Sequence, residues 1–244
     1  MPRLSHFFWI VSLLFIAGCA STPATLEQNN SSGTAGEEAY PEPDPLILSL
    51  LDSYRDSLDS VMGVPVAVVE DTLRFGQPES SLGNIVADAI RFRAGSELSR
   101  FVHIGIMGES SFKLYLNPGE LTVGEVMDFM PYDNHLVILT LTGEDVFALA
   151  NQVAEMGGSP VSGMRFRINN GRASGILVNS EVLDRNGSYL VATSSWAADG
   201  GDLYPALWSY KERVDLDVSM RDLFVDYFRS RRVVAPLQDG RIRR

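Results

Sequence analysis

The sequence has few of the residues that bind transition metals or form cross-links: one cysteine and three histidines among 244 residues. A single cysteine excludes a disulfide within the chain. His6 falls in an N-terminal apolar segment, so only His103 and His135 remain for the folded part. Catalytic metal centres need several histidine and carboxylate ligands, and no Gly-x-Ser-x-Gly nucleophile elbow occurs. We therefore predict neither a metal site nor a catalytic residue in this chain.

Positive charge is scarce as well. The chain has 20 Lys and Arg against 31 Asp and Glu, which gives a formal net charge of −11 at pH 7. Proteins that bind the phosphate backbone of a nucleic acid need clustered Lys and Arg, so we predict no nucleic-acid partner. The basic residues that do cluster lie near the C-terminus and are interpreted as a solvated face. They are Arg229, Arg231, Arg232, Arg241, Arg243 and Arg244.

The apolar runs are too short to span a bilayer, which takes about 20 residues. One such run, from Phe7 to Ile16, follows Arg3 and precedes two small residues and Cys19. This order of a positive charge, a short apolar run and small residues is typical of a cleaved signal peptide. We predict a signal peptide at residues 1–18.

The residues around the predicted cleavage point lead to a second expectation. Ile16-Ala17-Gly18-Cys19 resembles the lipobox of bacterial lipoproteins. The resemblance implies that Cys19 is lipidated and anchors the chain to a membrane of the bacterial cell envelope, on its periplasmic or outer face. Several acyl chains hold a protein on a membrane stably, whereas one chain binds only marginally. The alternative is a free Cys19 thiol buried within an ordinary signal sequence.

Residues 19–43 have a composition unlike that of a folded domain. They are rich in Ser, Thr, Asn, Gly, Pro and Glu and have almost no apolar residue. Such a segment cannot bury enough surface to offset the entropy that it would lose on ordering. We predict a disordered tether here, followed by a single domain at residues 44–244 that is long enough for a sizeable core.

Hydrophobic spacing in the predicted domain indicates helices alternating with strands at first and mainly hairpins later. Thr122 and Thr142 have the sequence context of helix N-caps, Gly95 is a predicted helix stop, and Asn170-Gly171 is a hairpin signal. We predict helices near 45–61, 82–95, 123–129, 143–156 and 220–228, and strands near 64–69, 101–107, 136–141, 163–168, 173–178 and 189–193. The predicted fold class is α+β, a layered domain with a mixed β-sheet.

Two aromatic residues carry the leading ligand hypothesis. Tyr132 follows Met130-Pro131, and Trp196 precedes Gly200-Gly201-Asp202. If the two rings converge across a cleft, they form a slot for a flat ring. Aromatic pairs contribute about 0.5–1.5 kcal/mol beyond their buried area, and stacking on a nucleobase contributes about 1–3 kcal/mol. We therefore predict a nucleobase ligand, although each residue taken singly is more often a core or rim aromatic.

Five stretches of the chain carry a family resemblance. They are Pro78 to Ala89, Pro118 to Val126, Met130 to Asn134 with Leu139 to Gly143, Val191 to Asp202, and Asp239 to Ile242. In this order they resemble the C-terminal domain of the 5'-nucleotidase family, across about residues 64–242. The resemblance implies the fold of that domain and a role in binding the nucleoside part of a substrate.

The resemblance also implies site residues. In the family, an aromatic residue in a Leu-Pro-Phe-Gly loop and another before Gly-Gly-Asp sandwich the base, and Tyr132 and Trp196 occupy these places. The family's Asp contacts the ribose hydroxyls, which implies the same role for Asp202, since a carboxylate can accept both hydrogen bonds of a vicinal diol. Alternatively, Asp202 is a turn residue that bonds nearby backbone amides. Lys113 and Asn134 complete the candidate substrate-binding residues.

One family element differs in this chain. Where the family has Asn-Gly-Gly-Gly-Ile-Arg, this chain has Gly108 to Lys113, so Gly108 replaces the Asn and Lys113 the Arg. Lysine keeps the charge but lacks the planar fork that binds a phosphate through two bonds. Glu109 adds a negative charge where a phosphate would lie, and Gln77 stands nearest to a further family Arg. These changes favour a nucleoside over a nucleotide, or a degenerate site.

In the 5'-nucleotidase family, hydrolysis takes place in a separate metallophosphoesterase domain with two divalent metals. This chain has no Asn-His-Glu motif, and its one Asp-x-His triplet, Asp133-Asn134-His135, directly follows Tyr132. We predict a lipid-anchored domain that recognises a nucleoside or nucleotide and acts in nucleotide catabolism with a separately encoded metallophosphoesterase. The first alternative is a structural or interaction lipoprotein of the envelope with a degenerate ligand site. The second is a stand-alone nucleotide hydrolase.

Overall fold

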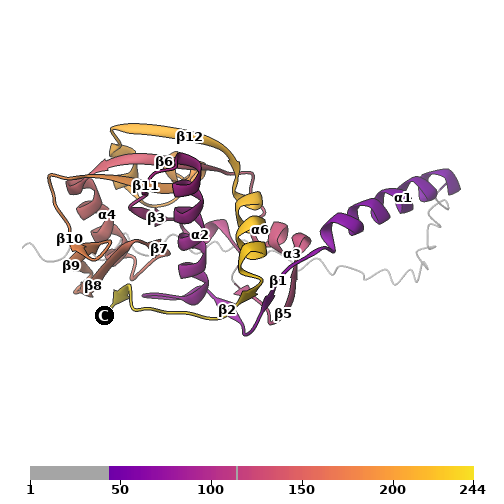
Figure 1. Ribbon diagram of the computed structural model, residues 1–244, viewed down its shortest axis with the longest axis horizontal. Coiled ribbons are helices and arrows are strands. Elements are labelled where there is room, and N and C mark those ends of the chain that lie inside the picture. The colour runs from indigo at the N-terminus through magenta and orange to yellow at the C-terminus, as the bar shows by residue number, and fades with distance from the viewer. Residues whose placement is uncertain (1–43, 114) are drawn as a thin grey trace, which may run out of the picture. The chain divides into compact units, whose positions relative to one another are not determined.

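The computed structural model describes residues 44–113 and 115–244 (Figure 1). The predicted signal peptide, Cys19 and the predicted tether up to residue 43 lie outside the described residues. Helices alternate with strands in the first half and hairpins follow in the second, which confirms the predicted α+β class.

A five-stranded mixed sheet lies at the centre of the fold, in the order β12-β6-β11-β3-β7. β11 is its middle strand, antiparallel to β6 and parallel to β3, as the sequence predicts for residues 189–193. The β6–β11 pairing runs without a bulge from Ser188 opposite Thr142 to Ser194 opposite Leu136. The strands of this sheet are β3 (Ile104–Ile106), β6 (His135–Thr142), β7 (Val161–Ser162), β11 (Ser188–Ser194) and β12 (Glu212–Ser219).

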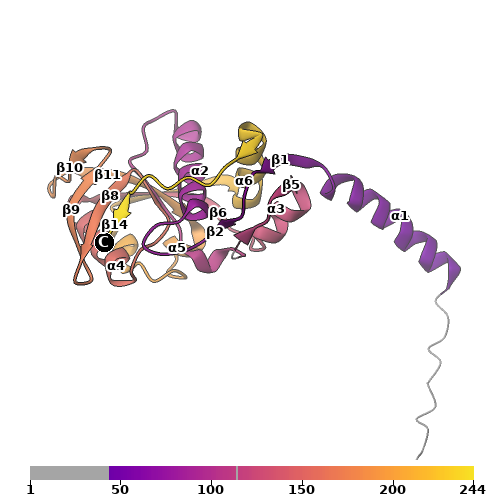
Figure 2. The same cartoon turned by 90° about the horizontal axis from the view of Figure 1, so that it is seen from below.

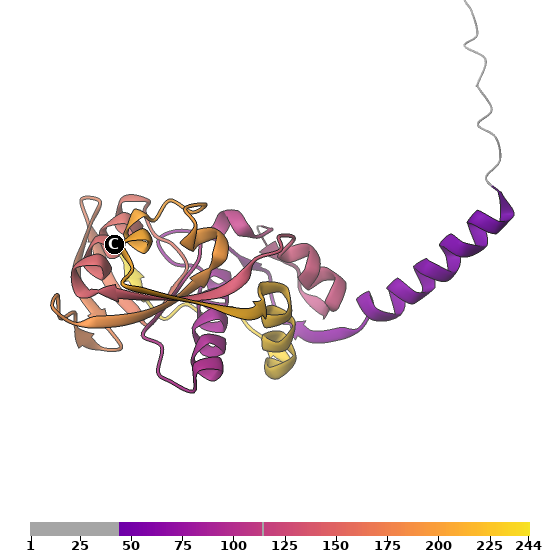
Figure 3. The same cartoon turned by 90° about the horizontal axis from the view of Figure 1, so that it is seen from above.

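Each face of the central sheet covers its own hydrophobic core. Successive side chains of a strand point to opposite faces, and β6 accordingly contributes Leu136 and Ile138 to one core and Val137 and Leu139 to the other. Helices α2, α3 and α6 pack in the first core and α4 in the second, and Figure 3 shows α2 and α6 on one side of the sheet. These helices are α2 (Ser81–Leu98), α3 (Val123–Phe129), α4 (Gly143–Glu155) and α6 (Met220–Arg231).

Side-chain caps fix where two of these helices begin. The Thr122 hydroxyl accepts from the Glu125 N–H at 3.3 Å, and the Glu125 carboxylate accepts from the Thr122 N–H at 2.8 Å. Thr142 and Asp145 make the same reciprocal pair at the start of α4. Each pair satisfies two N–H groups that have no partner inside the helix. Both predicted helix starts are confirmed.

The predicted stop of α2 at Gly95 is wrong. The helix continues to Leu98, and Ser99 ends it with a left-handed backbone (φ 49°), donating its N–H to the Gly95 and Ser96 carbonyls. The first strand after it is also shorter than predicted, because β3 begins only at Ile104 and Phe101 is exposed. Glycine is therefore tolerated inside this helix, and the polar Ser99 takes the left-handed position that glycine usually takes.

The β8–β9 hairpin, the short strand β10 and the C-terminal strand β14 form a second, four-stranded sheet in the order β10-β9-β8-β14. Asn170 (φ 49°) and Gly171 (φ 73°) both have positive φ angles, as the predicted two-residue turn requires. Figure 2 shows β14 beside β8, to which it is parallel. The strands are β8 (Met164–Asn169), β9 (Arg172–Val178), β10 (Glu181–Val182) and β14 (Ile242–Arg243).

The other strands form two small sheets. β1 (Pro65–Val69) pairs with β5 (Gly119–Thr122) and β13 (Val233–Val234), and β2 (Leu73–Arg74) pairs with β4 (Tyr115–Leu116). The predicted first helix is present as α1 (Pro45–Met62), but it has no buried residue. Its apolar stripe is therefore exposed within the part of the chain that the structure describes.

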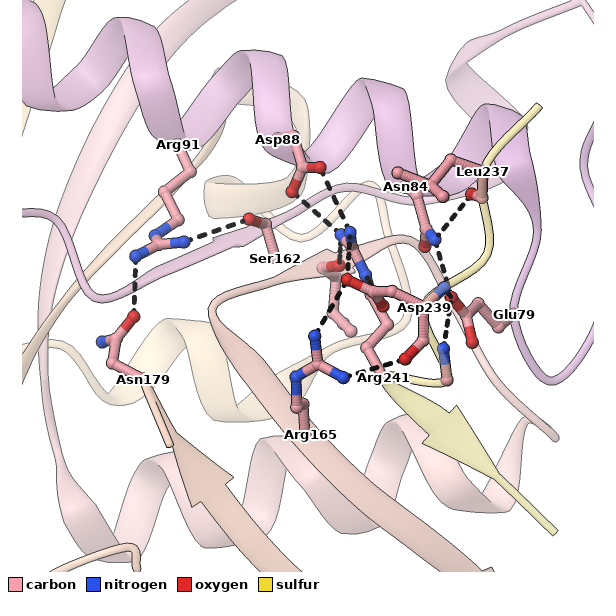
Figure 4. Close-up of polar contacts among 12 residues, drawn as sticks. Glu79, Asn84, Asp88, Arg91, Ser162, Arg165, Asn179, Leu237, Asp239 and Arg241 are labelled. Atoms are coloured by element: carbon pink, nitrogen blue, oxygen red, sulfur yellow. Dashed lines mark hydrogen bonds and ion pairs between the residues drawn. The ribbon is translucent and has the colours of Figure 1, made fainter. Parts of the chain in front are cut away.

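Arg241 ties the C-terminal segment to α2. Its guanidinium donates to both oxygens of Asp88, at 2.9 and 3.1 Å, and also pairs with Asp239 (Figure 4). Just before α2, the Glu79 carboxylate accepts from the Asp239 N–H at 2.8 Å and from the Asn84 amide at 2.7 Å. The prediction that Arg241 belongs to a solvated face is wrong, because its side chain is buried against α2.

Replacing Arg241 should destabilise the domain. In Arg241→Met, Asp88 and Asp239 lose their shared cation, and we expect the free energy of unfolding to fall by about 3 kcal/mol, the low end for breaking a buried ion pair because Asp88 is partly exposed. Urea unfolding at pH 7 measures this. Arg243→Met is the matched control, since the Arg243 side chain donates to the Gly240 carbonyl and pairs with no carboxylate of residues 44–113 or 115–244. Equal stability of the two variants would contradict this account.

Candidate ligand-binding site

The central sheet brings Tyr132 and Trp196 to one edge. Tyr132 lies three residues before β6 and Trp196 two residues after β11, and the pairing of these strands ends at Ser194 opposite Leu136. The His135 N–H donates to the Ser195 hydroxyl at 3.2 Å, which joins the two loops directly. Both aromatic side chains are about half exposed, at 54% and 51%. That their rings grip a base between them stays a prediction.

The loop that carries Tyr132 is held by α6. Arg221, in the first turn of that helix, donates to the Met130 carbonyl at 3.2 Å and to the Pro131 carbonyl at 2.6 Å. The Asn134 carbonyl accepts from the Met220 N–H at 2.9 Å. Sequence reasoning missed Arg221, because a lone arginine in a helix carries no signal for a loop 90 residues away.

Trp196 lies in the short helix α5 (Ser195–Ala198), which the Ser194 hydroxyl caps by accepting from the Ala197 N–H at 3.1 Å. The indole packs directly against Gly201: a Cβ built there would stand only 1.9 Å from its Cε2 atom. Gly200 has a positive φ of 97°, which a residue with a side chain adopts only with strain. Gly200 therefore allows the backbone conformation of this loop, and Gly201 leaves room for the indole.

Asp202 is almost fully buried, with 4% of its surface exposed. One carboxylate oxygen accepts from the Gly108 N–H at 2.8 Å and the other from the Ser110 hydroxyl at 3.0 Å. A Cβ at Gly108 would stand 2.3 Å from this carboxylate, so only glycine fits there. An ionised carboxylate has about four acceptor positions, so about two remain for a ligand. The predicted ribose contact of Asp202 stays a prediction.

A cleft of about 340 Å³ opens beside Asp202. Tyr132 and Trp196 are not part of its wall, but Gly201, against which the indole packs, is. Its lining residues are Gln77, Gly108, Glu109, Ser110, Met156, Gly158, Ser159, Gly201, Asp202, Leu203 and Tyr204. The cleft thus places two carboxylates next to the loop that carries Trp196.

Glu109 is the least satisfied polar group of this cleft. Its Oε1 atom is buried and has no hydrogen-bond partner among the described residues. Burial raises the pKa of the Glu109 carboxyl. Burial likewise raises the pKa of Tyr204, whose hydroxyl contacts that of Ser159. A ligand that donates hydrogen bonds suits a cleft lined by Glu109 and Asp202, whereas a second anion would be repelled.

Lys113 and Gln77, which the sequence analysis also named, differ in their position relative to the cleft. The Lys113 ammonium pairs with Asp128 at 3.1 Å on the surface and is not part of the cleft wall. Gln77 does line the cleft and donates to the Met156 carbonyl at 2.7 Å. The substrate role assigned to Lys113 stays a prediction, and the ion pair with Asp128 competes with it.

A polar network on the surface connects the two aromatic loops through β12. Arg213 donates to Asp199, just after α5, and through two bonds to Asp215. Asp215 in turn contacts His135 Nε2 at 2.9 Å, at the start of β6. The Arg213 guanidinium, followed by His135, lowers the pKa of Asp215. The strand that supplies Arg213 was not predicted, so sequence reasoning had no basis for placing this residue here.

Two absences hold for residues 44–113 and 115–244. In this range, no three His, Cys, Asp or Glu side chains gather in a group that could hold a metal ion. The helices of the same range include none with the length and hydropathy to cross a bilayer.

The family of this α+β domain follows from comparison with known proteins. Residues 65–209 match the family "5'-nucleotidase, C-terminal domain". The match covers more than half of the chain, and the chain belongs to this family.

Similar proteins are considerably longer. The trifunctional nucleotide phosphoesterase protein YfkN of Bacillus subtilis is 25% identical in an alignment 229 residues long that covers 84% of this chain and 16% of that protein. A 5'-nucleotidase of Vibrio parahaemolyticus is 23% identical in an alignment 202 residues long that covers 77% of this chain and 34% of that one. The 5'-nucleotidase precursor from Thermus thermophilus superposes with a TM-score of 0.68 at 26% identity, over 81% of this chain and 43% of that one. The chain thus spans less than half the length of each.

Glu109 should make stability depend on pH. Because its folded pKa is raised, the unfolded chain loses this proton first, so stability falls as the pH rises above the ordinary value of 4.5 and levels off above the folded pKa. Glu109→Gln cannot ionise, and its advantage over wild type should grow across the same range in urea unfolding at pH 4 to 8. Glu120→Gln, at an exposed position, should show no such trend. A pH-independent difference for Glu109→Gln would contradict the assignment.

Proposed function

We propose that this domain binds a nucleoside, and binds it better than the corresponding nucleotide. The observation that carries this proposal is the pair of carboxylates, Glu109 and Asp202, lining one cleft beside Gly201. Ribose hydroxyls and the exocyclic amine of a base donate hydrogen bonds, and carboxylates accept them. Membership of the 5'-nucleotidase C-terminal family supports the same ligand class.

The charge of the cleft favours the neutral ligand. Glu109 and Asp202 both line it, and Lys113 is paired elsewhere with Asp128. At an effective dielectric constant of about 20, two unit charges 4 Å apart interact by about 4 kcal/mol. The repulsion of a phosphate placed among these carboxylates would therefore exceed the stabilisation of about 1 kcal/mol that one hydrogen bond contributes.

Four of the five candidate substrate-binding residues have a direct role in the proposal. Tyr132 and Trp196, on loops joined by the His135 to Ser195 hydrogen bond, stack on the two faces of the base. Asp202 accepts from the ribose diol with the acceptor positions that the Gly108 loop leaves free. Asn134, half-buried beside Tyr132, contacts the rim of the base.

Calorimetry with adenosine and AMP tests this proposal. Adenosine should bind more tightly than AMP, and Trp196→Ala or Tyr132→Ala should weaken adenosine binding about 5- to 150-fold, the factor that corresponds to about 1–3 kcal/mol of stacking. Tyr115→Ala is the control, since Tyr115 is a half-exposed aromatic that packs with Arg74. No binding of either ligand, with unfolding curves that show a folded protein, would favour an interaction lipoprotein with a degenerate site.

The cellular setting is a second part of the proposal. We infer that Cys19 is lipidated and that the domain acts on the envelope surface in nucleotide catabolism, together with a metallophosphoesterase encoded separately. The lipobox-like Ile16-Ala17-Gly18-Cys19 supports the anchor. The names of two relatives, a nucleotide phosphoesterase and a 5'-nucleotidase, suggest a partner with this kind of activity.

Membrane fractionation and affinity capture test this setting. The full-length chain should sediment with membranes and Cys19→Ser should not, because its acyl attachment is lost. Capture of the wild-type chain from detergent-solubilised envelopes should retrieve a metallophosphoesterase. Phosphate release from AMP by the purified chain alone with Mn²⁺ would contradict the need for a partner, and a membrane-bound Cys19→Ser would contradict the anchor.

A further inference from the structure

A second cleft, larger than the first, opens along α2. It has a volume of about 790 Å³ and lies between α2, the loop before β3, the β7–β8 turn and the C-terminal segment. It shares no lining residue with the cleft beside Asp202. The proposed nucleoside site therefore does not account for it.

The charge of this second cleft is opposite to that of the chain. Two aspartates, Asp88 and Asp239, line it together with five arginines, so its lining carries a formal charge of +3 in a chain of net charge −11. The arginines are Arg91, Arg100, Arg165, Arg231 and Arg241. A concave surface lined by one sign of charge attracts ligands of the opposite sign.

Arg91 is the central cation of this second cleft and has only neutral partners. Its guanidinium donates to the Asn179 side chain at 2.6 Å and the Ser162 hydroxyl at 3.5 Å (Figure 4). It also donates to the Val102 carbonyl at 3.0 Å. Among the described residues, no carboxylate lies within ion-pair distance of it. Asp88 is the acidic residue whose charge acts on Arg91, but both Asp88 oxygens already accept from Arg241.

The partial burial of the Arg91 guanidinium disfavours its charge, as its pKa indicates. Burial lowers the pKa of Arg91, which means that the surroundings disfavour its charged form despite the attraction of Asp88. A partly buried cation is stabilised when an anion pairs with it. The three hydrogen bonds hold the guanidinium in place and leave its charge uncompensated.

The rim of the second cleft adds two more cations and two aromatic rings. Arg100 and Arg231 are exposed and form no ion pair with any described residue. Phe92 and Phe101 are 69% and 60% exposed, and the Arg91 guanidinium lies 5.4 Å from the Phe101 ring centre. Large exposed aromatic side chains beside arginines suit a ligand that has both an anionic and an apolar or flat part.

We propose that this second cleft binds a small soluble oxyanion ester, a phosphate or sulfate group carried on an apolar or aromatic body. The oxyanion pairs with Arg91, Arg100 and Arg231, and the body packs on Phe92 and Phe101. Arginine suits this ligand because its planar fork matches the oxygens of phosphate and sulfate.

Calorimetry with phenyl phosphate, phenyl sulfate and inorganic phosphate tests the proposal at low salt. Phenyl phosphate or phenyl sulfate should bind more tightly than inorganic phosphate. Arg91→Gln should weaken this binding at least tenfold, as should the double variant Arg100→Gln/Arg231→Gln, which alters only exposed residues and should fold normally. Arg172→Gln, at an exposed position on the β8–β9 hairpin, removes the same charge elsewhere and should bind like wild type.

Three outcomes would overturn the proposal. They are no binding of any of these anions at millimolar concentration, equal loss in Arg172→Gln, and binding to phosphatidylglycerol vesicles without binding to phenyl phosphate, since that would indicate a lipid surface. Trp196→Ala, which removes the proposed nucleoside contact, should leave the binding of phenyl phosphate unchanged. The two proposals can therefore fail independently.

Discussion

The seven-residue pairing of β6 with β11 is the constraint on which the candidate site depends. In this register, the start of β6 lies opposite the end of β11. The loops that carry Tyr132 and Trp196 are therefore at the same edge of the sheet. The strands are held in this register by burial on both faces, because a slip by one residue would exchange the side chains of the two cores. Arg221 and Arg213 then fix the loops from α6 and β12, two elements that follow later in the sequence.

Asp202 has a structural duty that limits what it can do for a ligand. Its carboxylate holds the Gly108 loop by two hydrogen bonds, and this contact requires that residue 108 have no side chain. The same contact brings Glu109 into the cleft, where one of its oxygens is left without a partner among the described residues. The absence of a side chain at Gly108 is therefore linked to the position of Asp202. The Gly108 loop and Asp202 together give the cleft its acceptor-rich, negative character.

The opposite balance of charge holds around α2. Arg241 is buried yet paired with Asp88 and Asp239, which makes it a structural cation that joins the C-terminal segment to the helix. Arg91, one turn after Asp88 on α2, is held by neutral groups alone. These two arginines beside one helix thus differ in function because Arg241 has taken both oxygens of Asp88. A chain of net charge −11 thus has one cleft lined by acidic residues and another lined mainly by arginines.

Local sequence was enough to predict the class of fold, the two capping boxes, the Asn170-Gly171 hairpin and the central strand β11, because each depends on residues close together in the chain. It also singled out Tyr132, Trp196 and Asp202 as candidate site residues, through five short stretches that resemble the family in order, and their ligand contacts stay predictions. It could not place Arg213, Arg221 or the β12 strand, nor show that Arg241 is buried and that α2 passes through Gly95. These features and the two clefts depend on the tertiary fold. The arginines contact carboxylates or carbonyls that are distant in the sequence, and such contacts produce no periodic pattern along the chain.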